Sequence, residues 1–298
     1  MTYMIHGATG AQGAPVAAAL IAAGKPVTAL TRNTDTVVDG AGVLAVDYSS
    51  TTDLTDAYRG ADGVFVHLPV APEEDRLAFA CNVVAAVREA RPARVVFSTS
   101  GAIVNTDDTS AVESAVSVLA TGLADSGVSH AVIEPRFYLE NLLLPHVIAG
   151  VREEGVLRYS LPGGFRTSWA SHLDIADVAI VLFERPDVTG VVSVGQYPAI
   201  SGEDLAEAFS TRLGRTVTYE ATDPHAFFAP LAPMLGEQAT AAIADMYRAL
   251  STQPDHDHGR ALRPETPRRD TADRGPVAGR HRSLTGIGDA VGCRWGAR

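Results

Sequence analysis

A glycine-rich turn near the N-terminus constrains the fold of this chain more than any other feature. A short apolar strand over residues 3–6 runs into three spaced glycines, and an alanine-rich stretch predicted to be helical follows over residues 16–23. In such a unit the first glycine permits a tight turn, the second admits a pyrophosphate, and the third lets helix and strand pack closely. The N–H groups at the helix N-terminus then favour phosphates. The residues expected to line this phosphate site are Gly7, Thr9, Gly10, Ala11, Gln12 and Gly13.

Alternation of strands and helices supports this interpretation over a simple strand-to-helix turn. Apolar, β-branched runs predict strands at about residues 27–30, 43–46, 63–66, 95–98 and 131–133, and helical patterns lie between them, notably over 75–90 and 111–125. Short strands with helical crossovers imply an α/β fold with a doubly wound parallel sheet of the Rossmann type. We expect a dinucleotide-binding domain over 1–150 whose sheet is completed by later segments. A small C-terminal α/β substrate region is expected over 151–252, and an Arg/Pro-rich tail over 253–298.

Composition narrows the class of protein. The 298 residues carry a net charge of -11, which argues against a nucleic-acid or anionic membrane surface. No apolar run reaches the roughly 20 residues of a membrane-spanning helix, and no signal peptide is recognised, so we expect a cytoplasmic protein. The two cysteines, Cys81 and Cys293, are not expected to form a disulfide. The sequence predicts no metal site.

The lysine content restricts the mechanism. Lys25 is the only lysine, and it lies at the entry to the second predicted strand, away from the carboxyl ends of the strands where an active site is expected. No tyrosine has a lysine four residues later. The tyrosine–lysine pair that many short-chain dehydrogenases use is therefore absent, which also disfavours a sugar-nucleotide epimerase. The position of the single lysine likewise disfavours Schiff-base chemistry.

The loop after the second predicted strand bears on the choice of cofactor. Proteins that prefer NAD(H) usually place an acid here to bind the ribose hydroxyls, whereas this chain has Arg32 and Asn33. A guanidinium pairs well with a 2′-phosphate, so we favour NADP(H) and leave NAD(H) open. The alternative is a solvated arginine, and Asp35 nearby weighs against the phosphate preference.

Three further loops follow strands that end at the same edge of the predicted sheet. Each is expected to contact the dinucleotide, although each is also compatible with an ordinary strand-to-loop junction. Flanking the adenine we expect Asp47 and Tyr48, and towards the nicotinamide His67, Leu68, Pro69, Thr99 and Ser100.

The segment over residues 133–142 joins the sixth predicted strand to a helix through a proline and two aromatic residues. Together with residues 7–13, 31–33, 174–178 and 201–214, it resembles the NmrA-like branch of the atypical short-chain dehydrogenases/reductases, over roughly residues 1–250. The resemblance implies a Rossmann domain with a small substrate region and adds Pro135 and Phe137 to the expected cofactor contacts.

The resemblance also implies a range of activities. They include NADPH-dependent reduction of quinones and of triphenylmethane dyes, and relatives occur among aromatic polyketide tailoring enzymes. Other members are dinucleotide-sensing regulators that turn nothing over. The relatives that reduce phenylpropanoids carry a lysine that this chain lacks, which argues against that role.

Aromatic residues predict a pocket for a planar ligand. The expected substrate contacts are Phe137, Tyr138, Phe165, Trp169 and His172, because large rings with a few polar tips suit a polycyclic substrate. The alternative is that these rings seal the interface between the two regions. Asp174 with Asp177, and Ser201 with Asp204, have the spacing of helix caps and are not assigned to catalysis.

A quinone or cationic dye accepts hydride readily, so positioning against the nicotinamide and modest oxyanion stabilisation suffice. The side chains expected to stabilise the oxyanion or donate a proton are Ser100, Tyr138 and Asn141. We therefore expect an NAD(P)H-dependent oxidoreductase of a small aromatic or quinone-like substrate, with hydroxylation through reductive activation as an extension. A dinucleotide-sensing regulator is the alternative, and a homo-oligomer stays open.

Overall fold

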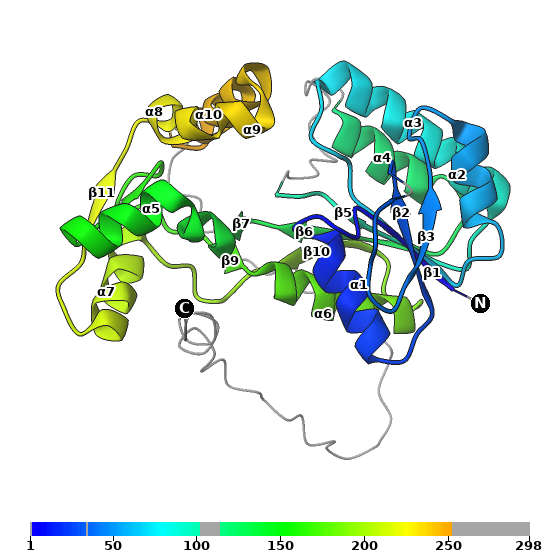
Figure 1. Cartoon of the computed structure of the whole chain (residues 1–298), viewed down its shortest axis with the longest axis horizontal. Helices are drawn as coiled ribbons and strands as arrows, with labels where there is room; N and C mark the ends of the chain where they lie inside the picture. The colour runs from blue at the N-terminus through cyan, green and yellow to red at the C-terminus, as the bar shows by residue number, and fades with distance from the viewer. Residues whose placement is uncertain (1, 34, 102–113, 252–298) are drawn as a thin grey trace, which may run out of the picture.

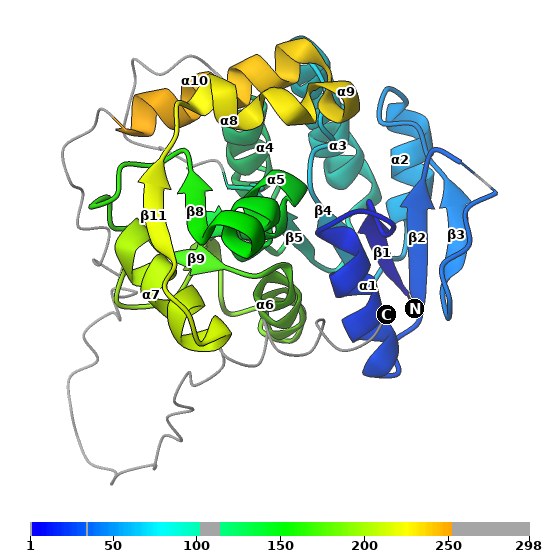
Figure 2. The same ribbon diagram turned by 60° about the vertical axis from the view of Figure 1, so that its left-hand side comes forward.

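A parallel sheet of seven strands forms the larger part of the molecule. The computed structural model describes residues 2–33, 35–101 and 114–251. The strands follow the order β10-β6-β5-β4-β1-β2-β3, so the chain reverses its direction of travel across the sheet between β1 and β4 (Figure 1; β4 is labelled in Figure 2). This is the expected doubly wound fold. The strands are β1 (Tyr3–His6), β2 (Val27–Thr31), β3 (Gly42–Ala45), β4 (Gly63–Val66), β5 (Val95–Ser98), β6 (His130–Pro135) and β10 (Gly190–Val194).

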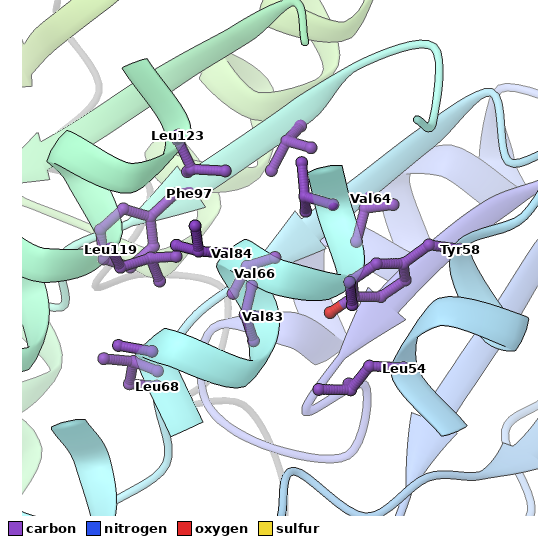
Figure 3. Close-up of a cluster of buried hydrophobic side chains, with 14 of the residues drawn as sticks. Leu54, Tyr58, Val64, Val66, Leu68, Val83, Val84, Phe97, Leu119 and Leu123 are labelled. Carbon is purple, nitrogen blue, oxygen red and sulfur yellow. The ribbon is translucent and has the colours of Figure 1, made fainter. Parts of the chain in front are cut away.

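Helices cover both faces of the sheet, because the strands are apolar on both. In β4, Val64 and Val66 pack on one side and Phe65 on the other, and all three are fully buried. Burying one such side chain contributes about 1.5–3 kcal/mol. Figure 3 shows the core on the side of Val64 and Val66, where Leu54, Val83 and Leu119 pack against the sheet. One face carries α2 (Thr51–Tyr58), α3 (Glu73–Ala90) and α4 (Ala115–Ala124), and the other α1 (Gly13–Ala22) and α6 (His172–Glu184).

A smaller region stands beside the sheet and has a core of its own (Figure 2). A short parallel pair, β7 and β9, joins it to the carboxyl end of β6. Its interior is filled by aromatic rings in tilted or edge-to-face contact. Its elements are β7 (Phe137–Tyr138), the 3-10 turn η1 (Leu139–Leu143), α5 (Pro145–Ala149), η2 (Gly150–Glu154), β8 (Val156–Tyr159), β9 (Trp169–Ala170), α7 (Gly202–Leu213), β11 (Thr218–Ala221), α8 (Pro224–Phe228), η3 (Ala229–Leu231), α9 (Ala232–Leu235) and α10 (Glu237–Ser251).

The helix caps differ from expectation at one position. α7 begins with the predicted pair: Asp204 N donates to Ser201 Oγ at 3.2 Å, and Ser201 N to Asp204 Oδ2 at 2.8 Å. α6 begins with Ser171, whose N–H donates to Asp174 Oδ2 at 2.7 Å. The predicted pairing of Asp174 with Asp177 is wrong. The N-cap of α6 is Ser171, and Asp174, three residues later, is its partner and not itself the N-cap.

Some expectations fall on residues that the structure does not describe. The tail over 253–298 lies outside the described ranges, as do the first three residues of the helix predicted over 111–125. Within the described ranges, no helix is long and apolar enough to span a membrane. The same residues include no cluster of three or more His, Cys, Asp or Glu side chains arranged to hold a metal ion.

Candidate cofactor and substrate site

The glycine turn joins β1 to α1 at the carboxyl edge of the sheet. Gly7 has a φ of +60°, which a residue with a side chain rarely adopts. A Cβ on Gly13 would lie 2.3 Å from Gly7 O and 2.4 Å from His6 O, so helix and strand approach too closely for any side chain there. Thr9, Gly10 and Ala11 are exposed, and the first turn of α1 contains no acidic residue. The loop therefore presents helix N-terminal N–H groups to an incoming anion.

Arg32 and Asn33 follow β2 at the same edge, and both are exposed. The Asn33 side chain is engaged with its own loop, because Asp35 N donates to Asn33 Oδ1 at 2.9 Å. Hydrogen bonds from Ser49 lower the pKa of Asp47, and the Arg32 guanidinium lowers it further. Arg32 and Asp47 therefore lie within electrostatic reach of one another, one after β2 and one after β3.

His67 follows β4 and packs against the first glycine. A Cβ on Gly7 would lie 2.1 Å from His67 Nε2, so the imidazole fills the space that a side chain at Gly7 would need. Burial lowers the pKa of His67, which favours the neutral ring. Tyr48 Oη donates to His67 O at 3.0 Å and fixes the end of β4 against the loop after β3. The next two residues continue this edge, Leu68 buried and Pro69 partly buried.

Gln12 connects the glycine turn to the end of β5. Ser98 Oγ donates to Gln12 Oε1 at 2.7 Å, and Gln12 Nε2 donates to Ser100 Oγ at 2.8 Å. Gln12 is 9% exposed, whereas Ser100 is exposed. Ser100 has a φ of +61°, an uncommon value for a residue with a side chain, and Thr99 beside it is buried. Two predicted site residues 88 positions apart are thus in direct contact.

Phe137 and Tyr138 follow β6, after the buried Pro135, and face opposite regions. Adjacent residues of a strand point to opposite sides. Tyr138 packs with the sheet core and Phe137 with the core of the smaller region. Burial raises the pKa of Tyr138, and the nearby Ser98 hydroxyl opposes part of that rise. Tyr138 Oη has no hydrogen-bond partner of ordinary geometry among the described residues.

The predicted substrate aromatics divide between these two sides. Trp169 is 3% exposed, stacks on Phe137 at 5.5 Å between ring centroids, and belongs to the core of the smaller region, which Phe165 also contacts. For Phe137 and Trp169 this placement matches the alternative of rings that seal an interior. His172 instead packs on Tyr138 at 4.4 Å, at the N-terminus of α6.

Glu140 holds the start of α6 in place. Its Oε1 accepts from Ser171 Oγ at 2.9 Å and from His172 N at 3.0 Å, and its Oε2 lies 3.9 Å from His172 Nδ1. Burial lowers the pKa of His172, and the Glu140 carboxylate opposes that shift. Asn141 turns away from this group, because its Nδ2 donates to Tyr159 Oη at 3.3 Å in the smaller region.

A small apolar hollow of about 190 Å³ lies apart from these residues, between η1, α5 and η2 on one side and α7 on the other. Leu143, Val151 and Phe209 are among its lining residues. None of the predicted site residues lines it, so the hollow is not where we place the cofactor or the substrate.

The structure therefore brings Gln12, Ser100, Tyr138 and His172 to one edge, with Arg32 and Asp47 further along it. Sequence reasoning missed Ser98 and Glu140 as supporting residues. Ser98 lies within the fifth predicted strand and has the pattern of an ordinary strand residue. Glu140 lies in the segment over residues 133–142, which carried the family resemblance but indicated no role for this residue. Nothing in the local sequence indicates contacts over 86 or 31 positions.

Comparison with known proteins supports the resemblance found in the sequence. The model of the NmrA-like family matches residues 2–262. A (4-alkanoyl-5-oxo-2,5-dihydrofuran-3-yl)methyl phosphate reductase of Streptomyces griseus subsp. griseus is 31% identical over 228 residues, which cover 73% of this chain and 76% of the relative.

Two solved structures show the same fold. An NADPH-dependent quinone oxidoreductase of Escherichia coli, in complex with NADPH, has a TM-score of 0.61 and 21% identity, over 82% of this chain and 88% of its own. A triphenylmethane reductase of Citrobacter sp., in complex with NADP(H), has a TM-score of 0.66 and 18% identity, over 86% and 93%. The Streptomyces reductase supports the expectation of an oxidoreductase.

Proposed function

The chain belongs to the NmrA-like family, and from that membership we propose that it is an NAD(P)H-dependent reductase that transfers a hydride to a quinone-like or polycyclic aromatic acceptor. The observation that carries the proposal is the close packing of Gly13 on Gly7 O, which leaves a turn of exposed backbone at the N-terminus of α1. That geometry suits a pyrophosphate, and hydroxyl-bearing side chains lie along the same edge.

NADP(H) is the favoured cofactor. Arg32 is exposed beside the turn, where a 2′-phosphate of the adenine ribose would be held, and a guanidinium binds phosphate through two parallel N–H···O bonds. Asp47 lies within electrostatic reach of the same guanidinium, Asp35 follows Arg32 in the loop, and these two acids keep NAD(H) in the proposal. The cofactor supplies the hydride at nicotinamide C4, and the protein positions that carbon against the acceptor.

An electron-poor acceptor suits the side chains at this edge. The single lysine, Lys25, lies 3.6 Å from Glu184 and precedes β2, at the opposite end of the strand from the glycine turn. The substrate named for the Streptomyces relative has a carbon–carbon double bond conjugated to two carbonyl groups, and a quinone shares that arrangement. Such acceptors need less acid assistance than an isolated ketone needs. Ser100, Tyr138 or a water molecule would provide that assistance.

The test is anaerobic oxidation of NADPH and NADH against a panel of acceptors. The panel contains a naphthoquinone, an anthraquinone, a cationic triphenylmethane dye, a 4-alkanoyl-dihydrofuranone phosphate and, as a negative control, a simple aliphatic ketone. We expect turnover of at least one electron-poor acceptor and none of the ketone. Tight cofactor binding without turnover of any acceptor would instead support the dinucleotide-sensing regulator.

A second experiment tests the extension to hydroxylation. A hydroquinone that reacts with oxygen either returns to the quinone with release of hydrogen peroxide or becomes a hydroxyquinone, in which case one oxygen atom of O2 forms a C–O bond to the ring and the other leaves as water. The extension predicts the second course: with aromatic polyketide quinones in air, we expect a hydroxylated product in step with NADPH oxidation and oxygen consumption, whereas oxygen consumption that yields only hydrogen peroxide would contradict the extension. Clean accumulation of hydroquinone in air would remove the extension and leave the reductase proposal intact.

A further inference from the structure

Gln12 occupies an unusual place for a residue of a phosphate-binding turn. Its side chain is buried and points away from the exposed backbone of the loop, towards the end of β5. There it makes one hydrogen bond as a donor and one as an acceptor, at 2.8 Å and 2.7 Å. Both ends of the amide are therefore engaged with serine hydroxyls rather than available to a phosphate.

The direction of these two hydrogen bonds determines where the Ser100 proton can go. Ser98 Oγ receives a long contact of 3.5 Å from Ser100 N and donates its own proton to Gln12 Oε1. The amide oxygen is thereby committed to Ser98, so the amide nitrogen faces Ser100 and donates to Ser100 Oγ. A serine hydroxyl that accepts a hydrogen bond keeps its own proton for another acceptor.

Ser100 is placed to use that proton. It is exposed and follows β5 at the carboxyl edge, where the proposed function puts the nicotinamide and acceptor. Its φ of +61° is a costly conformation for serine, of the kind that persists where the surroundings hold it. Gly101, with a φ of +101°, continues the turn.

We propose that Gln12 is a positioning residue for the reduction: its amide orients Ser100 so that the Ser100 hydroxyl donates to the oxyanion that forms on a quinone or conjugated carbonyl acceptor. The inference rests on the proposed function and deepens it. A hydride, one proton with two electrons, leaves nicotinamide C4 for the acceptor, and NADP⁺ forms. The reduced acceptor bears an oxyanion that Ser100 stabilises and that takes one proton from solvent, giving the neutral reduced product.

The acceptors differ in their need for this hydrogen bond. A cationic triphenylmethane dye takes hydride on its central carbon and becomes neutral, without an oxyanion and without a proton. A quinone develops negative charge on oxygen. Loss of a preorganised oxyanion donor lowers kcat by about a hundredfold or more in enzymes that use one. Gln12→Met, close in size and unable to bond Ser100, should therefore slow quinone reduction about a hundredfold at saturating NADPH and leave dye reduction within about threefold.

Three comparisons keep the inference falsifiable. In a double-mutant cycle, Gln12→Met should have no further effect on quinone kcat in a Ser100→Ala background, because it acts through Ser100. Gln12→Glu should still accept from Ser98 but accept from Ser100 as well, which turns the Ser100 proton inward, so quinone kcat should fall. Protonation of the introduced carboxylate at low pH restores a donor, so that loss should shrink as the pH falls. The other titratable side chains near this edge are His67, Tyr138, Glu140 and His172, and dividing the Gln12→Glu profile by the wild-type pH profile removes their contributions.

The outcomes separate this inference from the proposed function. Failure to turn over any acceptor, with NADPH bound, counts against the reductase itself. Turnover in which Gln12→Met and Ser100→Ala lose activity additively, or in which quinone and dye slow equally, overturns the role of Gln12 and leaves the reductase standing. If the dye is not accepted, the cycle and the Gln12→Glu pH profile decide, and a pH-independent loss in Gln12→Glu contradicts the inference. Each variant's NADPH dissociation constant is measured so that every kcat refers to cofactor-saturated protein.

Discussion

The carboxyl edge of the sheet and the interior of the smaller region both contain side chains that hydrogen-bond one another, but in different surroundings. At the edge, Gln12, Ser98 and Ser100 bond one another across long separations in the chain, and the last of them is exposed. In the smaller region, Tyr159 and Tyr247 bond each other at 3.0 Å while both are buried among aromatic rings. The hydrogen-bonded polar groups thus reach the surface at the sheet edge, through Ser100, and are buried in the smaller region.

This difference assigns separate roles to the two regions. The edge of the sheet presents a hydroxyl that a ligand can reach, whereas Tyr159 and Tyr247 in the smaller region are bonded to each other and enclosed. Tyr138 and His172 lie at the border, packed on each other and on the sheet core. We infer that the sheet edge carries the chemistry and that the smaller region acts mainly through the border it supports. The predictions below separate these roles, in order of decreasing effect.

Replacing Gly13 by valine should have the largest effect. The new side chain would collide with backbone atoms of residues 6 and 7 rather than with a flexible side chain, so the turn must open. We expect affinity for NADPH to fall by more than about a hundredfold, with a loss of thermal stability. Gly164→Ala is the matched control, because a Cβ at Gly164 meets nothing within 4 Å. Equal NADPH dissociation constants for Gly13→Val and the control would contradict the site.

Replacing Phe227 by alanine should damage the other region. The ring is 2% exposed and lies 4.9 Å from the ring of Tyr159, so its removal leaves a cavity. We expect a loss of about 3–5 kcal/mol in the free energy of unfolding, measured by chemical denaturation. The NADPH dissociation constant should change by less than about twofold while the protein is folded. Met234→Ala, at a side chain that is 72% exposed, should be nearly neutral. A weakened cofactor affinity in Phe227→Ala would show that the regions are coupled.

Replacing Arg32 by alanine should change cofactor preference at the sheet edge. A charged hydrogen bond to phosphate contributes about 1.5–3 kcal/mol, so affinity for NADPH should fall roughly 10- to 100-fold. NADH lacks the 2′-phosphate, and its affinity should change by less than about threefold. Titration of each cofactor by fluorescence checks this, with Arg59→Ala on exposed surface as the control. An equal loss for both cofactors would mean that Arg32 supports the loop rather than reading the phosphate.

The buried histidine of β1 should produce the smallest effect. Burial lowers the pKa of His6 to about 3, and its Nε2 lies 2.7 Å from Tyr58 Oη. In the unfolded chain His6 binds a proton near pH 6.5, whereas in the folded chain it stays neutral down to about pH 3. The contribution of His6 to the free energy of unfolding is therefore complete above pH 6.5 and is lost as the pH falls towards 3. At pH 5.5 the loss from this residue is about 1.4 kcal/mol.

Denaturation of the wild type and of His6→Gln between pH 7.5 and 5.5 measures this contribution. The amide keeps an acceptor for Tyr58 and does not titrate, so the difference between the two curves isolates His6 from the other histidines. If the free energies of unfolding of the two proteins changed equally with pH, the pKa of His6 would be the same in the folded and unfolded states, which would contradict the prediction.

Much of the sheet was predictable because local rules fix it. Strands buried on both faces must be apolar throughout, and Gly13 is required by the close approach of the backbone of residues 6 and 7 within the same turn, which is why β1, β4, β5 and the turn lie where the sequence places them. Helix caps were less certain, since several acids near residue 174 have similar spacing and Ser171 competes with them.

The candidate site was only partly predictable. Sequence reasoning named Gln12 and Ser100 separately, but their bond depends on how the turn after β1 meets the end of β5. It grouped Phe137 with Tyr138 as substrate residues, although neighbours in a strand face opposite sides and Phe137 joins the smaller core. It took Asn141 as a candidate for catalysis, and that amide bonds Tyr159 instead. Long-range packing decided all three.

The most direct test of the central claim is hydride transfer from NADPH itself. NADPH-loaded protein would be mixed anaerobically with a triphenylmethane dye or a 4-alkanoyl-dihydrofuranone phosphate, using cofactor deuterated at C4 in each stereochemical position. Both acceptors retain a transferred hydride on carbon. We predict that product from one of the two labelled cofactors carries one deuterium by mass spectrometry, at the rate of NADPH oxidation. Bound NADPH that stays reduced with both acceptors and with the quinones, or product without deuterium from either label, would contradict the claim.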